Sequence, residues 1–114
     1  MVFIARKSSI ESNQLTDTIY FILLCLSAPS YGYALMAKIE EITDGTLKIG
    51  PGSMYTTLKK MLDAGLVEIL DRDTKTYVIT QNGRESLIRD FKRRRKIVEQ
   101  SVGIINDLEG EANG

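Results

Sequence analysis

The sequence contains no histidine, no tryptophan and a single cysteine, and each shortage narrows the range of functions. Histidine is the commonest general base and the commonest transition-metal ligand, so its absence disfavours catalysis and metal binding. Cys25 lies within an apolar run, where we expect a small buried hydrophobe, and without a second cysteine an intrachain disulfide is impossible. Because the carboxylates are scattered and no nucleophile has a base beside it, we expect no enzyme, no metal and no cofactor.

Net charge and long apolar runs are absent as well. The 15 basic and 15 acidic residues cancel, so no global field attracts nucleic acid or an anionic membrane. The apolar run at 19–28 is shorter than the roughly 20 residues that cross a bilayer. The first residues lack the apolar stretch and cleavage site of a signal peptide. We therefore expect a cytoplasmic protein without a membrane partner, built as one compact domain of 114 residues.

Hydrophobic periodicity predicts two short helices in the first half of the chain. Residues 15–26 are nearly all apolar, which indicates a central helix capped by Thr16 or Asp17. Ser30 offers a side-chain oxygen as the N-cap of a second, amphipathic helix that ends near residues 44 and 45. The segment 46–50 that follows is either a brief strand or a loop.

The stretch "GPGSMYTTLKKMLDAGL" at 50–66 predicts a third helix with two distinct faces. Gly65 stands where a left-handed residue commonly ends a helix. At about 100° per residue, one face is apolar and the opposite face is polar. The apolar face contains Met54, Leu58, Met61 and Leu62, and the polar face contains Ser53, Thr56, Lys59, Lys60 and Asp63.

Two β-rich segments and a long helix complete the predicted elements. Residues 66–70 and 76–80 are β-branched or aromatic, and the charged turn between them predicts a two-stranded hairpin. Thr80 can cap a last helix over 81–108. The polar residues 109–114 predict a flexible tail.

Three helices followed by a hairpin is the element order of a winged helix-turn-helix, in which the third helix enters the major groove and the hairpin tip reaches the DNA backbone. Tyr55 lies at the border of the two faces, where a DNA contact and a core role are both open. An ordinary solvated surface is the alternative reading of the polar face, and a protein-interaction module that does not bind DNA is the alternative function. The predicted DNA-binding residues are Ser53, Tyr55, Thr56, Lys59, Lys60, Arg72 and Lys75.

An apolar stripe follows the last predicted helix at spacings near 3.5, broken once by Arg95. Because so long a helix cannot bury this stripe against one small domain, we expect a homodimer; packing on the first helix is the alternative. The basic run at 92–96 is either a solvated collar, a set of phosphate contacts or a source of ion pairs to a partner helix. The predicted dimerisation residues are Ile88, Phe91, Val98, Val102 and Ile105.

The segments "YGYALMAKIEE", "IGPGSMYTTLKKMLDAGLVE" and "TYVITQNGRESL" resemble the PadR family of transcriptional regulators. The resemblance runs from residue 15 to the end and suggests the short type with a single C-terminal helix. We therefore expect an α+β, mostly α fold: an extension at 1–14, a winged helix-turn-helix at 15–80, a dimerisation helix at 81–108 and a tail at 109–114. The matching positions are Gly32, Tyr33, Gly52, Tyr55, Leu58, Leu62, Gly65, Leu66, Thr80 and Gly83.

The resemblance also implies a function, namely a dimeric repressor of transcription that binds double-stranded DNA and is often controlled by a small aromatic or lipophilic effector. Phe21, Cys25 and Phe91 are the candidate lining of an effector site, with core packing as the alternative. Tyr31 stands where family members commonly have histidine, so any contact specific to histidine is in doubt. Because tryptophan is absent, a multidrug pocket of stacked indoles is not expected.

Overall fold

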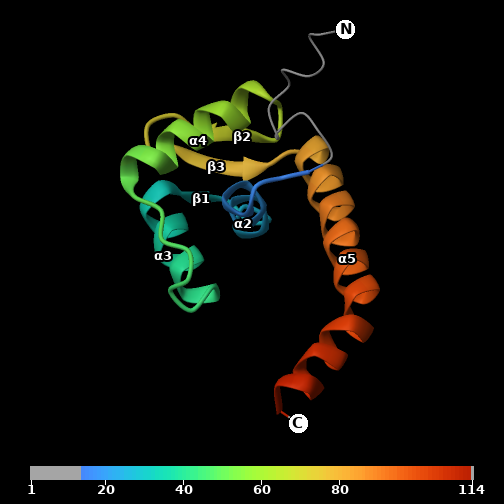
Figure 1. Cartoon of the computed structure of the whole chain (residues 1–114). Coiled ribbons are helices and arrows are strands. Elements are labelled where there is room, and N and C mark those ends of the chain that lie inside the picture. Colours follow the sequence, from blue (N-terminus) through green and yellow to red (C-terminus); the bar gives the residue numbers. More distant parts are fainter. Residues whose placement is uncertain (1–13, 114) are drawn as a thin grey trace, which may run out of the picture.

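The computed structural model describes residues 14–113, which form four helices and one three-stranded sheet (Figure 1). Of the predicted extension at 1–14, only residue 14 lies within the described residues. In Figure 1, α3 and α4 lie at one end of the molecule, α5 lies at the other, and α2 stands between them. The elements are α2 (Asp17–Cys25), β1 (Ser30–Tyr31), α3 (Gly32–Ile42), α4 (Pro51–Asp63), β2 (Val67–Asp71), β3 (Thr76–Ile79) and α5 (Gln81–Asn113).

Helix α2 supplies the centre of the core. Thr16 is its N-cap, because the Thr16 Oγ1 accepts a hydrogen bond of 3.2 Å from the Ile19 amide. The nearly continuous apolar sequence predicts a helix that is buried on all sides. That prediction is wrong for one side of α2, since Leu24 is 37% exposed. The core contains Leu15, Ile19, Tyr20, Ile22, Leu23, Leu26, Leu35, Ile39, Met54, Leu58, Met61, Leu66, Val67, Tyr77 and Ile79.

The sheet has a strand that the sequence did not reveal. Ser30 is not the N-cap of α3, because Ser30 and Tyr31 form strand β1 and Tyr31 occupies the N-cap position. Strand β1 pairs with β3 in antiparallel fashion, with Ser30 opposite Tyr77 and Tyr31 opposite Thr76. The strand order β1-β3-β2 therefore places β3 in the middle. A strand of two residues is too short to show an alternating pattern, which explains why it was missed.

The hairpin of β2 and β3 forms the predicted wing. A bulge interrupts its register between Ile69 and Asp71. At the tip, the Asp71 Oδ1 accepts hydrogen bonds from the amides of Asp73 at 2.9 Å and Thr74 at 3.3 Å. Lys75 then adopts a left-handed conformation with φ of 53°. These contacts give the short turn a defined shape and hold its basic residues outside the sheet.

Helix α4 has the two faces that the sequence predicts. Met54, Leu58 and Met61 are fully buried, whereas Leu62 is half-buried at the edge of the core. The segment 46–50 before the helix is a loop rather than a strand. Gly65 ends the helical region with φ of 75°, which confirms the predicted left-handed terminator.

The start of α5 is fastened to the end of α4. The Thr80 hydroxyl donates to the Gly65 carbonyl at 2.6 Å and accepts from the Gly83 amide at 3.0 Å, so Thr80 is the predicted cap of α5. Gly83 packs so tightly that a Cβ atom there would overlap the Leu66 carbonyl and the Ile79 side chain. Glycine is required at this position because neither a backbone carbonyl nor a buried side chain can move aside easily.

Helix α5 contains 33 residues, which corresponds to a length of roughly 50 Å. The prediction that it ends at residue 108 is wrong, because helical structure continues through 109–113. Its first half packs against α2 and β3, and its second half extends away from the domain (Figure 1). No helix within residues 14–113 combines the length and the hydropathy that a membrane span requires.

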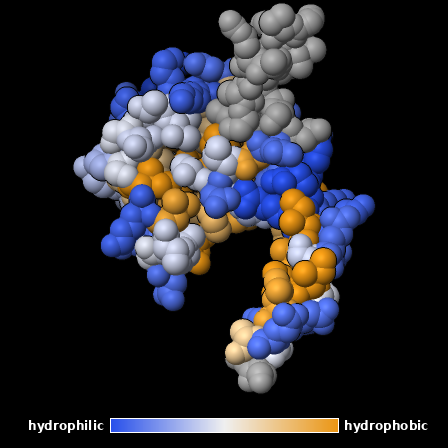
Figure 2. Space-filling model, in the orientation of Figure 1, coloured by the Kyte–Doolittle hydropathy of each residue, from blue (hydrophilic) through white to orange (hydrophobic). Residues whose placement is uncertain are grey.

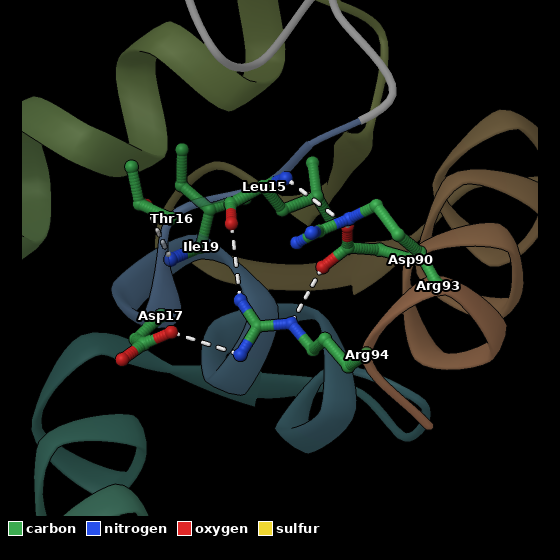
Figure 3. Close-up of polar contacts among 7 residues, drawn as sticks. All are labelled: Leu15, Thr16, Asp17, Ile19, Asp90, Arg93 and Arg94. Atoms are coloured by element: carbon green, nitrogen blue, oxygen red, sulfur yellow. Dashed lines mark hydrogen bonds and ion pairs between the residues drawn. The ribbon is translucent and has the colours of Figure 1, made fainter. Parts of the chain in front are cut away.

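One buried carboxylate joins α5 to the start of α2, in a group that we call the Asp90 clamp: Asp90, Arg93, Arg94, Leu15 and Asp17. The Asp90 side chain is completely buried and accepts hydrogen bonds from the Nε atoms of Arg93 at 2.8 Å and Arg94 at 2.7 Å. The Leu15 amide also donates to it at 3.4 Å. Figure 3 shows the Arg94 guanidinium between Asp90 and α2, where it donates to Asp17 at 2.8 Å and to the Leu15 carbonyl at 3.0 Å.

The clamp changes the interpretation of the basic run at 92–96. Arg93 and Arg94 are ion-paired within their own chain and are only about one-third exposed. The Arg94 guanidinium also lies over the Tyr20 ring at 4.2 Å from its centroid. These two arginines are therefore structural, and neither belongs to a solvated collar.

The pKa of Asp90 is lowered from its ordinary value by the clamp. Burial alone raises this pKa, but the hydrogen bonds from Arg93, Arg94 and the Leu15 amide outweigh it. A carboxyl group whose pKa is lower in the folded state stabilises the fold above its unfolded pKa of about 3.9, and this stabilisation is lost as the pH falls through the folded pKa.

We predict that Gly83→Ala destabilises the protein by at least about 2 kcal/mol, because the added methyl group meets a backbone carbonyl. The matched control is Gly103→Ala in the same helix, where no atom lies within 4 Å of the added Cβ. The control should gain roughly 0.5–1 kcal/mol from helix propensity. Urea unfolding at a fixed protein concentration measures both changes, and equal stability of the two variants would contradict the packing described.

We predict that Asp90→Asn lowers the free energy of unfolding at pH 7 by on the order of 3 kcal/mol, because it leaves the partly buried Arg93 without a counter-charge and Arg94 with only the exposed Asp17. The wild-type protein should progressively lose this advantage as the pH falls below about 4, because the unfolded chain then binds a proton at Asp90 that the folded carboxylate, with its lowered pKa, does not yet bind. Urea unfolding between pH 7 and pH 3 checks both statements. A constant difference across that range would show that folding does not lower the pKa of Asp90.

Candidate nucleic-acid interface

Helix α4 carries the predicted polar face on the outside of the domain. Ser53, Thr56, Lys59 and Lys60 are all exposed, and we call these four residues the recognition face. The buried residues Met54, Leu58 and Met61 hold the opposite face against the core, so α4 cannot turn without exposing them. The packing thus fixes which side chains a ligand outside the domain would meet.

Tyr55 is mainly a packing residue. Its side chain is half-buried and packs against the core, where its ring and hydroxyl lie directly against Gly32. A Cβ atom at position 32 would overlap the Tyr55 ring. The two residues therefore fix the contact between α3 and α4, and glycine at position 32 is explained by this close approach.

A first hollow separates α4 from the wing. Its volume is about 580 Å³, and its lining includes Tyr55 and Lys59 from α4 together with Lys75 and Tyr77 from the hairpin. The structure thus brings Lys59 and Lys75 to one hollow although they are 16 positions apart in the sequence. Arg72 is exposed at the tip of the same hairpin. We call this space the wing hollow.

A second hollow lies between α4 and the N-terminus of α2, and we call it the α2–α4 hollow. Its polar lining consists of Ser53 and Lys60, the helix cap Thr16, and the side chains of Thr18, Lys48 and Thr57. The last three residues were not among the predicted site residues. Thr57 stands at the border of the α4 pattern, and the other two come from separate segments, so no periodic signal in the sequence points to them.

The lysines around α4 are available for a ligand. Lys59 lies 3.6 Å from Asp63 and Lys48 lies 3.9 Å from Glu40, but both pairs are exposed to solvent. Exposed pairs contribute little and exchange easily for a phosphate. Within residues 14–113, Lys60, Arg72 and Lys75 make no ion pair.

The N-terminus of α4 is open as well. Its N-cap, Gly50, makes no side-chain cap hydrogen bond, and Pro51 follows at the first helical position. Gly50 and Gly52 have no atom within 4 Å of the place where a Cβ would stand. The free amides and the positive end of the helix dipole favour a negatively charged group here.

The predicted dimerisation stripe is exposed along α5. Exposed fractions are 54% for Ile88, 47% for Phe91, 61% for Val98, 47% for Val102 and 48% for Ile105. Figure 2 shows that hydrophobic surface continues over the C-terminal half of α5, where it faces the space beside the domain. Three further exposed apolar residues, Ile97, Ile104 and Leu108, broaden this surface beyond the predicted stripe.

The three candidate effector residues lie on two helices and differ in burial. Phe21 and Cys25 pack against the core from α2, whereas Phe91 is half exposed on α5, where Arg95 lies over its ring. The Phe21 ring meets the Tyr20 ring edge-on at 5.7 Å. Burial raises the pKa of the Cys25 thiol, which agrees with a packing role for this residue.

Solved structures similar to this chain include RosR and a transcriptional regulator. The structure of the hsRosR-S1 complex matches with a TM-score of 0.63 and 26% sequence identity, over 94% of this chain and 100% of that one. RosR from H. salinarum matches with a TM-score of 0.59 and 27% identity, over 82% and 96%. A transcriptional regulator from Clostridium thermocellum, at 23% identity, 78% and 89% coverage and a TM-score of 0.56, shares the fold. No curated protein is similar enough to this sequence to count as a match.

The model of one protein family matches more than half of the chain. It describes the PadR-like family of transcriptional regulators, and the match covers residues 22–89, from the middle of α2 into the first turns of α5. The matched region includes the complete recognition face and the wing. Together with the structural neighbours, it confirms the predicted winged-helix fold with its long C-terminal helix and the expectation that the protein is not an enzyme. The chain belongs to the PadR-like family of transcriptional regulators.

Proposed function

We propose that this protein is a dimeric, sequence-specific repressor that inserts α4 into the major groove of DNA. The observation that carries the proposal is the recognition face, which exposes two hydroxyl groups and two lysines on a helix whose other face is fixed in the core. Hydroxyl and ammonium groups are the donors that bind phosphates and base edges. A surface for a protein partner would more often expose apolar side chains.

The wing supports this placement of DNA. Arg72 and Lys75 lie on the hairpin beside α4, and Lys75 borders the wing hollow together with Lys59. A hairpin in this position reaches the backbone next to the groove that the helix occupies. Thr56 and Lys59 would then contact base edges, whereas Arg72 and Lys75 would contact phosphates and contribute affinity without sequence preference.

A second copy of the chain is the natural cover for the stripe on α5. The stripe is exposed on a helix that leaves its own domain, and apolar side chains are stabilised by roughly 1.5–3 kcal/mol each when they become buried. Pairing through α5 would present two copies of α4 to successive major grooves, roughly 34 Å apart on a two-fold-symmetric site.

Repression requires only that the dimer occupies its site and thereby excludes other proteins from the DNA. An effector could act through the same dimer, because a partner covering Phe91 could close a space that also includes Phe21 and Cys25. The affinity for DNA would then depend on a small aromatic or lipophilic molecule bound beside α5.

We predict that Arg72→Gln combined with Lys75→Gln lowers the slope of log affinity against log salt concentration by about 2, because two phosphate contacts are lost. Fluorescence anisotropy on a 24-base-pair duplex, at several KCl concentrations, measures this slope. The matched control is Lys92→Gln with Lys96→Gln on the exposed side of α5, which changes the net charge equally. Equal slopes for the two double variants would remove the wing from the interface.

We predict that Val102→Asp converts the dimer into a monomer, because it places a charge within the apolar stripe. Gly103→Asp is the control: it lies one position further along α5, on a side where the added group meets no atom within 4 Å. Sedimentation equilibrium distinguishes the two variants. A monomeric wild-type protein, or two variants with the same mass, would contradict dimerisation through this stripe.

A further inference from the structure

The α2–α4 hollow has the chemistry of a phosphate-binding site. Its volume is about 460 Å³, and its polar lining includes the ammonium groups of Lys48 and Lys60 and the hydroxyl groups of Thr18, Ser53 and Thr57. No carboxylate belongs to the described lining. Cations and hydroxyl donors are complementary to a phosphodiester, whose free oxygens only accept hydrogen bonds.

The charges of this hollow are not neutralised from within the chain. Lys60 makes no ion pair among residues 14–113, and Lys48 has only Glu40 at 3.9 Å, in a pair whose side chains are 70% and 53% exposed. Such a pair is weak, so a bound phosphate could replace the carboxylate. Lys48 and Thr18 come from outside α4, which widens the basic surface beyond the recognition face.

The position of the hollow relative to the wing suggests its ligand. Ser53, Thr57 and Lys60 border it on one flank of α4, whereas Tyr55 and Lys59 border the wing hollow on the other flank. A helix in the major groove lies between two phosphate backbones, one on each flank. The wing can reach only the backbone on its own side, so the second backbone would lie at the α2–α4 hollow.

The Asp90 clamp holds one wall of this hollow in place. Arg94 donates to the Leu15 carbonyl and to Asp17, so it binds the chain on both sides of Thr16, which also lines the hollow. The first turn of α2, which carries Thr18, is thereby fixed relative to α5. Figure 3 shows these contacts converging on the residues around Thr16.

We propose that the α2–α4 hollow binds a phosphate of the DNA backbone on the side of α4 opposite the wing, with Lys48 and Thr18 as contact residues. This inference rests on the proposed function, because it requires α4 to lie in the major groove. Lys48 contributes charge, and Thr18 contributes a hydroxyl donor. Neither residue reads a base, so both affect all sequences alike.

Three single variants test the proposal on a duplex of random sequence by fluorescence anisotropy between 50 and 300 mM KCl. Lys48→Gln removes the charge, and Thr18→Val removes the hydroxyl group while keeping the shape of the side chain. Lys92→Gln, on the exposed side of α5, removes the same charge as Lys48→Gln at a residue that does not line the hollow. Thermal unfolding of each variant confirms that its fold is intact, and Lys48 is exposed enough for its replacement to leave the fold unchanged.

We expect Lys48→Gln to weaken binding roughly 3- to 10-fold at 100 mM KCl and to lower the salt slope by about 1, while Lys92→Gln changes neither. Thr18→Val should weaken binding without changing the slope, because it removes no charge. In addition, Glu40→Gln should strengthen binding, since it frees Lys48 from its carboxylate. Equal behaviour of Lys48→Gln and Lys92→Gln on a duplex that the wild-type protein binds would overturn the inference and leave the proposed function intact.

Titration with inorganic phosphate, followed by NMR of the backbone amides, distinguishes a DNA phosphate from a free anion. We expect the amides of Thr18, Lys48 and Thr57 to shift with the duplex and to remain unchanged in millimolar phosphate. Saturable shifts with free phosphate, combined with an unaltered salt slope in Lys48→Gln, would assign the hollow to a free anion and overturn the inference. No binding of any duplex by the wild-type protein would overturn the proposed function itself, and this inference with it.

Discussion

The burial of one carboxylate, Asp90, determines how the two halves of this protein are joined. Its two arginine partners are three and four residues further along α5, so the helix itself brings them to the carboxylate. Arg94 continues the contact to Asp17 and to the Leu15 carbonyl at the start of α2. Removing one partner of such a group is costly, because the charge that remains cannot return to water. The direction in which α5 leaves the domain therefore depends in part on this group of polar contacts.

The direction of α5 matters because the surface proposed to bind DNA and the surface proposed to bind a second protomer lie on different elements. The recognition face lies on α4, whereas the apolar stripe lies on α5, and α2 stands between them. Gly83 and Thr80 fasten α5 to the end of α4 and to the sheet, and the Asp90 clamp fastens it to α2. With α5 held at both places, a dimer formed through the stripe would present two copies of α4 at a fixed spacing. A fixed spacing is what recognition of a two-fold-symmetric DNA site requires.

Features that depend on residues close together in the sequence could be predicted. The 3.6-residue pattern of α4 identified its buried and exposed faces, and the end of α4 at Gly65 and the cap of α5 at Thr80 followed from residue type. Contacts between distant segments could not be predicted in this way. Strand β1 depends on pairing with residues of β3 that are 45 and 47 positions away, and nothing in the sequence around Asp90 indicates that Leu15 lies beside it. The α2–α4 hollow combines three separate segments, so Thr18 and Lys48 gave no local signal.

The central claim is that the exposed polar face of α4 reads a particular DNA sequence. The most direct test is fluorescence anisotropy of the protein with a duplex from the region upstream of its own gene and with a scrambled duplex of the same composition, at several salt concentrations. We expect tight, strongly salt-dependent binding to the first duplex, with an affinity that exceeds the affinity for the second duplex by roughly three decades or more. Upstream segments tiled across neighbouring genes extend the search for a site. Equal weak binding to all of them, or none, would contradict sequence-specific recognition by α4.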